Sequence, residues 1–248
     1  MAVRPGTPFM DESPRYRPLY QQVYDFLVKQ IAAGEWGPGE SLPSEQALAG
    51  RLSVSQGTVR KALDALAADS LIDRRQGKGT YVAEHTQERA LFRFFRMARP
   101  GGARAVPTSV GDTLRRRVAR PADIAKLAMQ PGAEVYEVTR TRLIDGEPAV
   151  LEKIVVPAAL FPGLERHHPL PNALYALYQR DYGVNIVSTE EELRADAARK
   201  DDCRRLKLTP GAPLLHIDRV AVSLEGTRVE WRSSRCDTTH FVYAVTLS

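Results

Sequence analysis

Arg140 and Arg142 are spaced so that they can bind one anion together. They lie in a run with the alternation of a β-strand, where side chains two residues apart point to the same face. Neighbouring guanidinium groups hold phosphate or carboxylate through paired, charge-assisted hydrogen bonds. The alternative is a pair of solvent-facing charges. The spacing is compatible with a bidentate clamp for an anion and by itself leaves both interpretations open.

A second group of polar side chains lies between residues 55 and 78 and is suited to nucleic acid. Arginine suits guanine and glutamine suits adenine in the major groove, hydroxyl groups bind phosphate, and a thin glycine-containing tip can enter a minor groove. Each residue alone is as well explained by a solvated surface, but together they favour DNA. The candidates are Ser55, Gln56, Gly57, Thr58, Arg60 and Lys61 on a predicted helix, and Arg74, Arg75, Gln76, Gly77 and Lys78 on a predicted turn.

The remaining reactive side chains do not form a recognisable catalytic or metal site. His167 and His168 lie in a predicted loop without a third ligand nearby, and Cys236 has no evident base. Cys203 and Cys236 are the two cysteines, too few for a disulfide framework. We therefore predict no catalytic residues, no metal and no cofactor.

The elements that would position the DNA candidates are three helices and a hairpin. A first helix starts at Leu19, a second is capped by Ser44, and a third begins after Ser55. Two short helices joined by a three- or four-residue turn form a helix-turn-helix, and the hairpin predicted for residues 71–82 forms a wing. The buried stripes are predicted from Leu19, Val23, Phe26, Leu27, Ile31, Val59, Ala62, Leu63 and Leu66.

Length and charge set the organisation of the chain. Its 248 residues exceed one ordinary core, so we expect a disordered arm (1–17), a winged domain (18–85), a linker (86–108) and a second domain (109–248). Lys and Arg balance Asp and Glu over residues 1–85, and the excess behind the net charge of +5 lies in residues 86–120. We expect no membrane span and no secretory signal, hence a cytoplasmic protein.

The second domain is predicted to be α+β with a mostly antiparallel sheet. Asp145-Gly146 and Glu225-Gly226 are hairpin turns between strand-like runs. A Pro-Gly-Ala turn followed by a strand with an inner arginine occurs twice, at residues 131–140 and 210–219. If the repeat is more than chance, the sheet is duplicated.

Residues 19–82 resemble the GntR family of bacterial repressors. The matching motifs are Pro18-Leu19-Tyr20-Gln21-Gln22, Gly39-Glu40-Ser41-Leu42-Pro43-Ser44-Glu45, Val54-Ser55 with Thr58-Val59-Arg60, and Arg75-Gln76-Gly77 with Gly79-Thr80-Tyr81-Val82. The resemblance implies operator contacts by Ser44, Gln46, Ser55, Gln56, Thr58, Arg60, Gln76 and Gly77. Gln46 and Gln56 stand where the family usually has arginine, which leaves the usual operator pattern open.

Residues 91–243 resemble the UTRA ligand-binding domain of the HutC subfamily, whose fold is similar to chorismate lyase. The motifs are Pro131-Gly132, Arg140 with Arg142, Asp145-Gly146-Glu147-Pro148, Leu151-Glu152, Leu174-Tyr175 and Val229-Glu230-Trp231. The resemblance implies an effector site of Arg140, Arg142, Glu152, Tyr175 and Glu230 for an anionic metabolite, a sugar phosphate or a carboxylate. Ala173 replaces a serine and Cys236 a tyrosine found in relatives.

These features predict a metabolite-responsive repressor that binds a palindromic operator as a homodimer. An enzyme is the main alternative, because a fold shared with chorismate lyase does not decide function. A DNA-architectural protein without a ligand is the third hypothesis, and it leaves residues 86–248 without a purpose. We expect the ligand signal to pass through residues 86–108.

Overall fold

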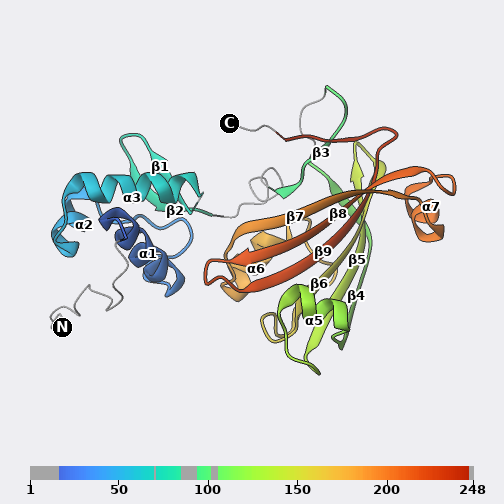
Figure 1. Cartoon of the computed structure of the whole chain (residues 1–248), viewed down its shortest axis with the longest axis horizontal. Helices are drawn as coiled ribbons and strands as arrows, with labels where there is room; N and C mark the ends of the chain where they lie inside the picture. Colours follow the sequence, from blue (N-terminus) through green and yellow to red (C-terminus); the bar gives the residue numbers. More distant parts are fainter. Residues whose placement is uncertain (1–16, 70, 85–93, 102–105, 246–248) are drawn as a thin grey trace. The chain divides into compact units, whose positions relative to one another are not determined.

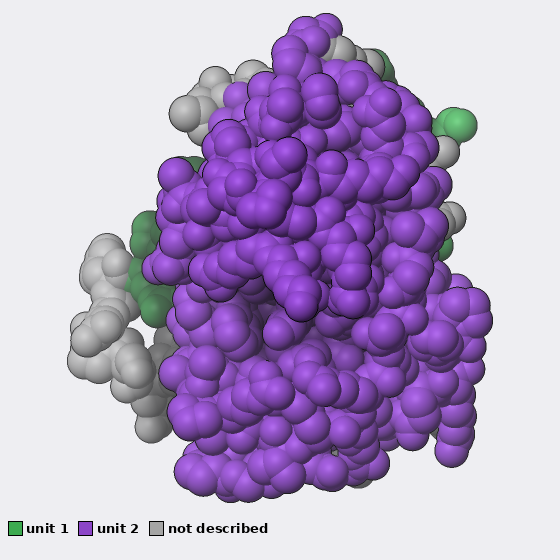
Figure 2. Space-filling view, turned by 90° about the vertical axis from the view of Figure 1, so that its right-hand side faces the viewer, with its two compact units in different colours: residues 1–84 green, residues 85–248 purple. Residues whose placement is uncertain are grey.

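The computed structural model describes residues 17–69, 71–84, 94–101 and 106–245, and the chain divides into two compact units, residues 1–84 and 85–248 (Figures 1 and 2). The arm predicted for residues 1–17 falls, apart from Arg17, outside the described residues. So does part of the predicted linker. The described linker residues 94–101 belong to the second unit.

The first unit is the predicted winged helix-turn-helix. It contains α1 (Leu19–Ala32), α2 (Glu45–Leu52), α3 (Gln56–Ala68), β1 (Ile72–Arg75) and β2 (Gly79–Val82) (Figure 1). Serine caps start both short helices, because Ser44 Oγ accepts the amide N–H of Ala47 at 3.2 Å and Ser55 Oγ accepts that of Thr58 at 3.1 Å. Ser53, with φ 53°, ends α2 in the left-handed conformation and turns the chain toward α3.

The apolar stripes predicted for the helices form the core of this unit, except at Leu19, where the prediction is wrong because this first residue of α1 is 46% exposed. The fully buried side chains come from one face of each helix and from the wing: Val23, Leu27, Leu48, Val59, Ala62, Leu63, Leu66, Ile72 and Val82. Gly77 adopts φ 70° at the wing tip, a backbone conformation that residues other than glycine rarely adopt. The core thus fixes α3 and the wing while leaving their outer faces exposed.

The second unit is built on the predicted antiparallel sheet. Its strand order is β4 (Thr108–Val118), β5 (Glu134–Ile144), β6 (Glu147–Pro157), β9 (Arg228–Asp237), β8 (Pro213–Ser223) and β7 (Ile186–Ala197). The helix α6 (Leu174–Tyr182) and the short 3-10 turn η1 (Leu164–His167) pack on the face that carries Tyr136 and Val138. The opposite face packs against α5 (Pro121–Leu127) and α7 (Lys200–Leu206).

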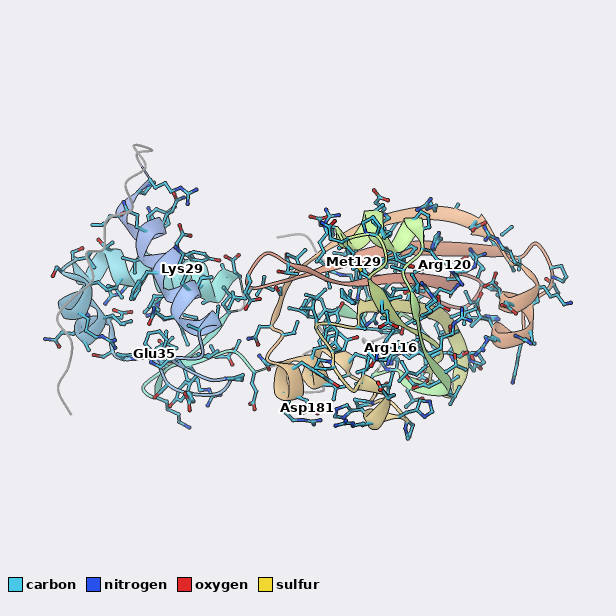
Figure 3. All side chains as sticks on the ribbon, turned by 90° about the horizontal axis from the view of Figure 1, so that it is seen from below. Lys29, Glu35, Arg116, Arg120, Met129 and Asp181 are labelled. Carbon is cyan, nitrogen blue, oxygen red and sulfur yellow. The ribbon has the colours of Figure 1, made fainter. Side chains whose placement is uncertain are left out.

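The sheet is duplicated, as the repeat in the sequence predicts. The order β4-β5-β6 is mirrored by β7-β8-β9, and each outer hairpin contains one short helix, α5 or α7. Asp123 accepts the N–H of Arg120 at the start of α5, as Asp202 accepts that of Arg199 at the start of α7. Arg120 and Met129 mark the two ends of the α5 turn in Figure 3.

A small two-stranded sheet lies beside the large one. Its strands β3 (Met97–Ala98) and β10 (Val242–Tyr243) pair antiparallel, and Met97 and Phe241 are buried against β5, β6 and β9. We call residues 94–99 and 241–244 the strap. Arg99 ties it to the β5–β6 turn through Asp145 at 3.1 Å and Glu147 at 2.8 Å. Within the described part of the chain, no helix is long and apolar enough to cross a membrane.

Candidate DNA interface and ligand cavity

The predicted DNA-contacting side chains lie on the outer surface of the first unit. Ser44, Gln46, Ser55, Gln56, Gly57, Arg60, Lys61, Arg75, Gln76, Gly77 and Lys78 are exposed, and Thr58 is half-buried. Ser44, Ser55 and Thr58 also serve as local structure, because Ser55 and Thr58 hydroxyls lie 2.8 Å apart within the cap of α3. The surface therefore combines helix N-termini, amides and cations, the groups that contact phosphates and base edges.

Glu45 joins the three elements of this surface. Its carboxylate accepts from Arg60 Nε on α3 at 3.0 Å and from Gln56 Nε2 at 3.4 Å, and it also pairs with Arg74 on β1. Hydrogen bonding from Arg60 is the main cause that lowers the pKa of Glu45. The sequence carries no local signal for this role of Glu45, because the pairing joins three elements and is a tertiary feature.

The cations of the surface differ in what already holds them. Arg74, which the sequence placed with the wing tip, turns back to Glu45 and Asp64. Arg75 lies over the Tyr81 ring, 4.3 Å from its centroid, and Lys61 Nζ lies 4.2 Å from the centroid of Tyr20 on α1. Arg75 and Lys78 thus remain available at the wing.

The second unit contains a cavity of about 560 Å³, its open mouth included, above the sheet face that carries Arg140 and Arg142. Its floor comes from β5, β6, β9 and β8, one wall from the start of α6, and the remainder from the strap. The polar lining includes Arg140, Arg142, Glu152, Tyr175, Arg219 and Arg232, together with Arg96 and Tyr243 of the strap.

Arg142 is buried without an acid partner among the described residues. Its Nη1 donates to Ser109 Oγ at 2.6 Å and to the carbonyl of Asn172 at 3.0 Å, while its Nε has no hydrogen-bond partner in the described structure. Burial, with the neighbouring charge of Arg140, lowers the pKa of Arg142 to about 9. An unpaired buried cation is costly, and an anion in the cavity would relieve that cost.

Arg140 is held by Glu152 rather than left free. Its Nε lies 2.8 Å from Glu152 Oε2, and the other oxygen of Glu152 lies 3.2 Å from Arg232 Nη1. Burial alone would raise the pKa of Glu152, but Arg232, Arg140 and Arg142 together bring it far below its ordinary value. Glu152 is therefore ionised and fixes two guanidinium groups at the cavity floor.

Glu230 lies beneath the cavity rather than in its lining. It is fully buried, its oxygens pair with Arg232 at 2.9 and 3.0 Å, and they accept the hydroxyls of Tyr175 and Tyr178, each at 3.0 Å. The predicted effector residues thus form one network in which Arg140, Arg142, Glu152 and Tyr175 face the cavity and Glu230 supports them.

Sequence reasoning missed the side of the cavity formed by Arg219, Arg232 and the strap. Arg219 pairs with Glu191 and donates to the carbonyl of Phe94, and Tyr243 donates to the same carboxylate. The repeat could have revealed Arg219, because it aligns this residue with Arg140. The strap residues carried no comparable signal.

The side chains that suggested an enzyme have structural surroundings. His167 lies 3.5 Å from Asp181, which Figure 3 labels next to the last turn of α6, and His168 contacts the carbonyl of Asp112 at 3.4 Å. Burial raises the pKa of the Cys236 thiol, which disfavours the thiolate that nucleophilic chemistry requires. Among the described residues, no three His, Cys, Asp or Glu side chains gather as a metal site.

Comparison with known proteins defines the class of this two-unit chain. Residues 19–82 match the model of the bacterial regulatory proteins of the gntR family, and residues 104–242 match the UTRA domain. The histidine utilization repressor of Pseudomonas putida is 32% identical over 211 residues, covering 85% of this chain and 84% of its own length. The mannosyl-D-glycerate transport/metabolism system repressor MngR of Escherichia coli (strain K12) is 31% identical over 202 residues, covering 81% and 83%.

Solved structures agree on the fold of the second unit. The ligand-binding domain of a GntR-family transcriptional regulator from Bordetella bronchiseptica matches with a TM-score of 0.59 and 28% identity, over 62% of this chain and 98% of that chain. PhnF from Mycobacterium smegmatis matches over 91% of this chain and 99% of its own, with a TM-score of 0.55 and 21% identity.

The chain belongs to the GntR family, with a UTRA domain as its second unit. It is a DNA-binding transcription regulator with an effector-binding domain, and its relatives are named as repressors of metabolic operons rather than as enzymes.

Proposed function

We propose that the protein is a repressor whose operator affinity is controlled by an anionic metabolite bound between Arg140 and Arg142. The observation that carries this proposal is the buried Arg142 guanidinium, which lines the cavity with its Nε unbonded and without an acid partner among the described residues. A phosphate or carboxylate placed there gains charge-assisted hydrogen bonds and removes an uncompensated charge. Tyr175 forms a wall of the site, and Glu230 acts on the ligand through Arg232.

On DNA, we propose that Arg60 and Gln56 read base edges in the major groove, while the start of each short helix contacts phosphate. Ser44 and Gln46 lie at the N-terminus of α2, and Gly57 lets the backbone of α3 approach the duplex. Arg75, Gln76, Gly77 and Lys78 of the wing reach the adjacent groove. Glutamines at positions 46 and 56 predict a weaker guanine preference than arginines would give.

We further propose that two copies bind a palindromic operator in the cytoplasm, with half-sites about one helical turn apart. The strap supplies the route by which the ligand acts on the DNA-binding unit. Phe95 lies over Arg142, its ring centroid 5.6 Å from the guanidinium carbon, and Phe94 contributes its carbonyl to Arg219. A ligand that engages these arginines changes their contacts with the segment that leads back toward the winged unit.

Selection of bound sequences from a random duplex pool, repeated with a panel of sugar phosphates and small carboxylates, tests the proposal. We expect an enriched palindrome whose recovery changes with one anionic metabolite. Sedimentation of the complex should show two chains per duplex. A selected site without symmetry and one chain per duplex would contradict the dimer, and recovery unaffected by every anion would contradict the effector class.

A further inference from the structure

The five arginines that line the cavity are not equivalent in charge. Arg140 pairs with Glu152, Arg219 with Glu191 and Arg232 with Glu230. Arg142 and Arg96 form no ion pair with any described carboxylate. The cavity therefore presents two guanidinium groups that no carboxylate of the described residues holds in an ion pair, although Glu152 and Asp112 act on Arg142 from a distance.

Arg142 and Arg219 lie at opposite corners of the cavity floor. Arg142 is on β5, and Arg219 is on β8, three strand spacings away, about 14 Å at the usual separation of strands. The pairing registers also offset them along the strands, because Arg142 shares a row with Val150 and Cys236, whereas Arg219 shares a row with Arg232. The two positions thus mark diagonal corners of the floor.

Arg96 belongs to the corner of Arg219. Its carbonyl accepts the N–H of Ala244 at 2.8 Å, next to Tyr243, whose hydroxyl donates to the carboxylate that holds Arg219. Arg96 also acts electrostatically on Tyr243 and so lies within range of this cluster. Between the two corners the lining contains the uncharged Val150, Ile217 and Ser234, and also Arg140, Glu152 and Arg232, whose charges are paired.

We propose that the effector carries two anionic groups, one at each end of a short chain, bound at Arg142 and at Arg96. This inference rests on the proposed function and narrows it from one anionic group to two. The central part of the ligand lies over β6 and β9. There the ionised Glu152 accepts hydrogen bonds from a hydroxylated chain, and the Ser234 hydroxyl donates or accepts them. A ligand with a single anionic group leaves the charge of Arg96 unmatched.

Calorimetric titration of the full-length protein with matched ligand pairs tests this. One pair is 6-phosphogluconate and glucose 6-phosphate, which share a phosphate and differ in a carboxylate at the far end; the other is adipate and hexanoate. We expect the member with two anionic groups, in at least one pair, to bind at least about tenfold more tightly, the effect of one added charge-assisted hydrogen-bonded group. Arg96→Gln should reduce this advantage to about twofold or less without weakening the binding of the member with one anionic group. Arg142→Gln should weaken the binding of both members.

The matched control is Arg99→Gln, because Arg99 is a strap arginine paired with Asp145 and Glu147 and does not line the cavity. Arg99→Gln should retain the preference for the member with two anionic groups. Equal binding of the two members of each pair, or a preference that survives Arg96→Gln, overturns the second anionic group and leaves the proposed function standing. Absence of binding by all four compounds and by inorganic phosphate overturns the proposed function and this inference with it.

Discussion

Replacing Arg142 by methionine should stabilise the unliganded second unit. Burial and Arg140 lower the pKa of Arg142 from 12.5 to about 9, which corresponds to about 5 kcal/mol against the charged form at about 1.36 kcal/mol per pKa unit. The variant loses the hydrogen bonds from Arg142 to Ser109 and to the Asn172 carbonyl, which keeps only the longer bond from Arg140 at 3.4 Å. We expect these losses to cost about 2–4 kcal/mol. The net expectation is a gain of about 1–3 kcal/mol in the free energy of unfolding at pH 7, with loss of anion binding.

Unfolding by guanidinium chloride, followed by tryptophan fluorescence in a Trp36→Phe background, measures this change in stability. Trp231 is then the one tryptophan left and reports on the second unit alone. The cost of the buried charge is complete below the folded pKa and shrinks as the pH rises above about 9, so the gain should be smaller at pH 10 than at pH 7. Arg116→Met is the matched control on the exposed end of β4, with an expected change within about 0.5 kcal/mol. A variant Arg142→Met that is less stable than the unmodified protein, with anion binding intact, would refute the reasoning.

Three further outcomes follow from the contacts. Glu45→Gln should weaken specific operator binding roughly tenfold while leaving non-specific binding unchanged. The arginines that Glu45 holds must then be ordered when DNA binds, at about 0.5–1.5 kcal/mol each. Fluorescence anisotropy titration measures this, with Glu35→Gln, a change at an exposed acid, as the control. Glu230→Gln should lower the stability of the second unit by about 2–3 kcal/mol, measured by denaturant unfolding, because it removes one of the two acids that hold the buried Arg232. A change below about 1 kcal/mol would contradict that. Burial and the hydrogen bond to Glu191 raise the pKa of Tyr243 to about 12, so stability should fall between pH 10 and 12 as the unfolded chain loses this proton first. Tyr243→Phe should flatten that part of the pH profile in thermal unfolding, and an unchanged slope would argue against the strap contact.

Much of the fold could be predicted because its signals are local. The cap serines, the helical spacing of Val59, Ala62, Leu63 and Leu66, and the glycine at the wing tip each depend on neighbours within a few residues. The duplicated sheet could be predicted because its repeat preserves a turn and a strand. The resemblance to known families added the order of the domains and the effector residues.

The candidate sites were predicted less completely because their remaining parts depend on distant contacts. The spacing of Arg140 and Arg142 indicates a shared face, but it does not show that Glu152 occupies one guanidinium and leaves the other unpaired. Likewise, the strap joins residues 94–99 to residues 241–244, a pairing without a local pattern. The pairing of Glu45 with Arg60 and Arg74 depends on the packing of α2, α3 and β1 and has no local pattern in the sequence.

The role of Arg142 is tested most directly by operator affinity, measured on the selected duplex with and without the anion that binds, for the unmodified protein and for Arg142→Gln. We expect the anion to change the affinity of the unmodified protein by about 5-fold or more, a coupling of about 1 kcal/mol or greater. Arg142→Gln should bind the duplex normally and should not respond to the anion. An equal response from both proteins, or no response from the unmodified protein to an anion that binds it, would contradict the claim that Arg142 connects the ligand to DNA.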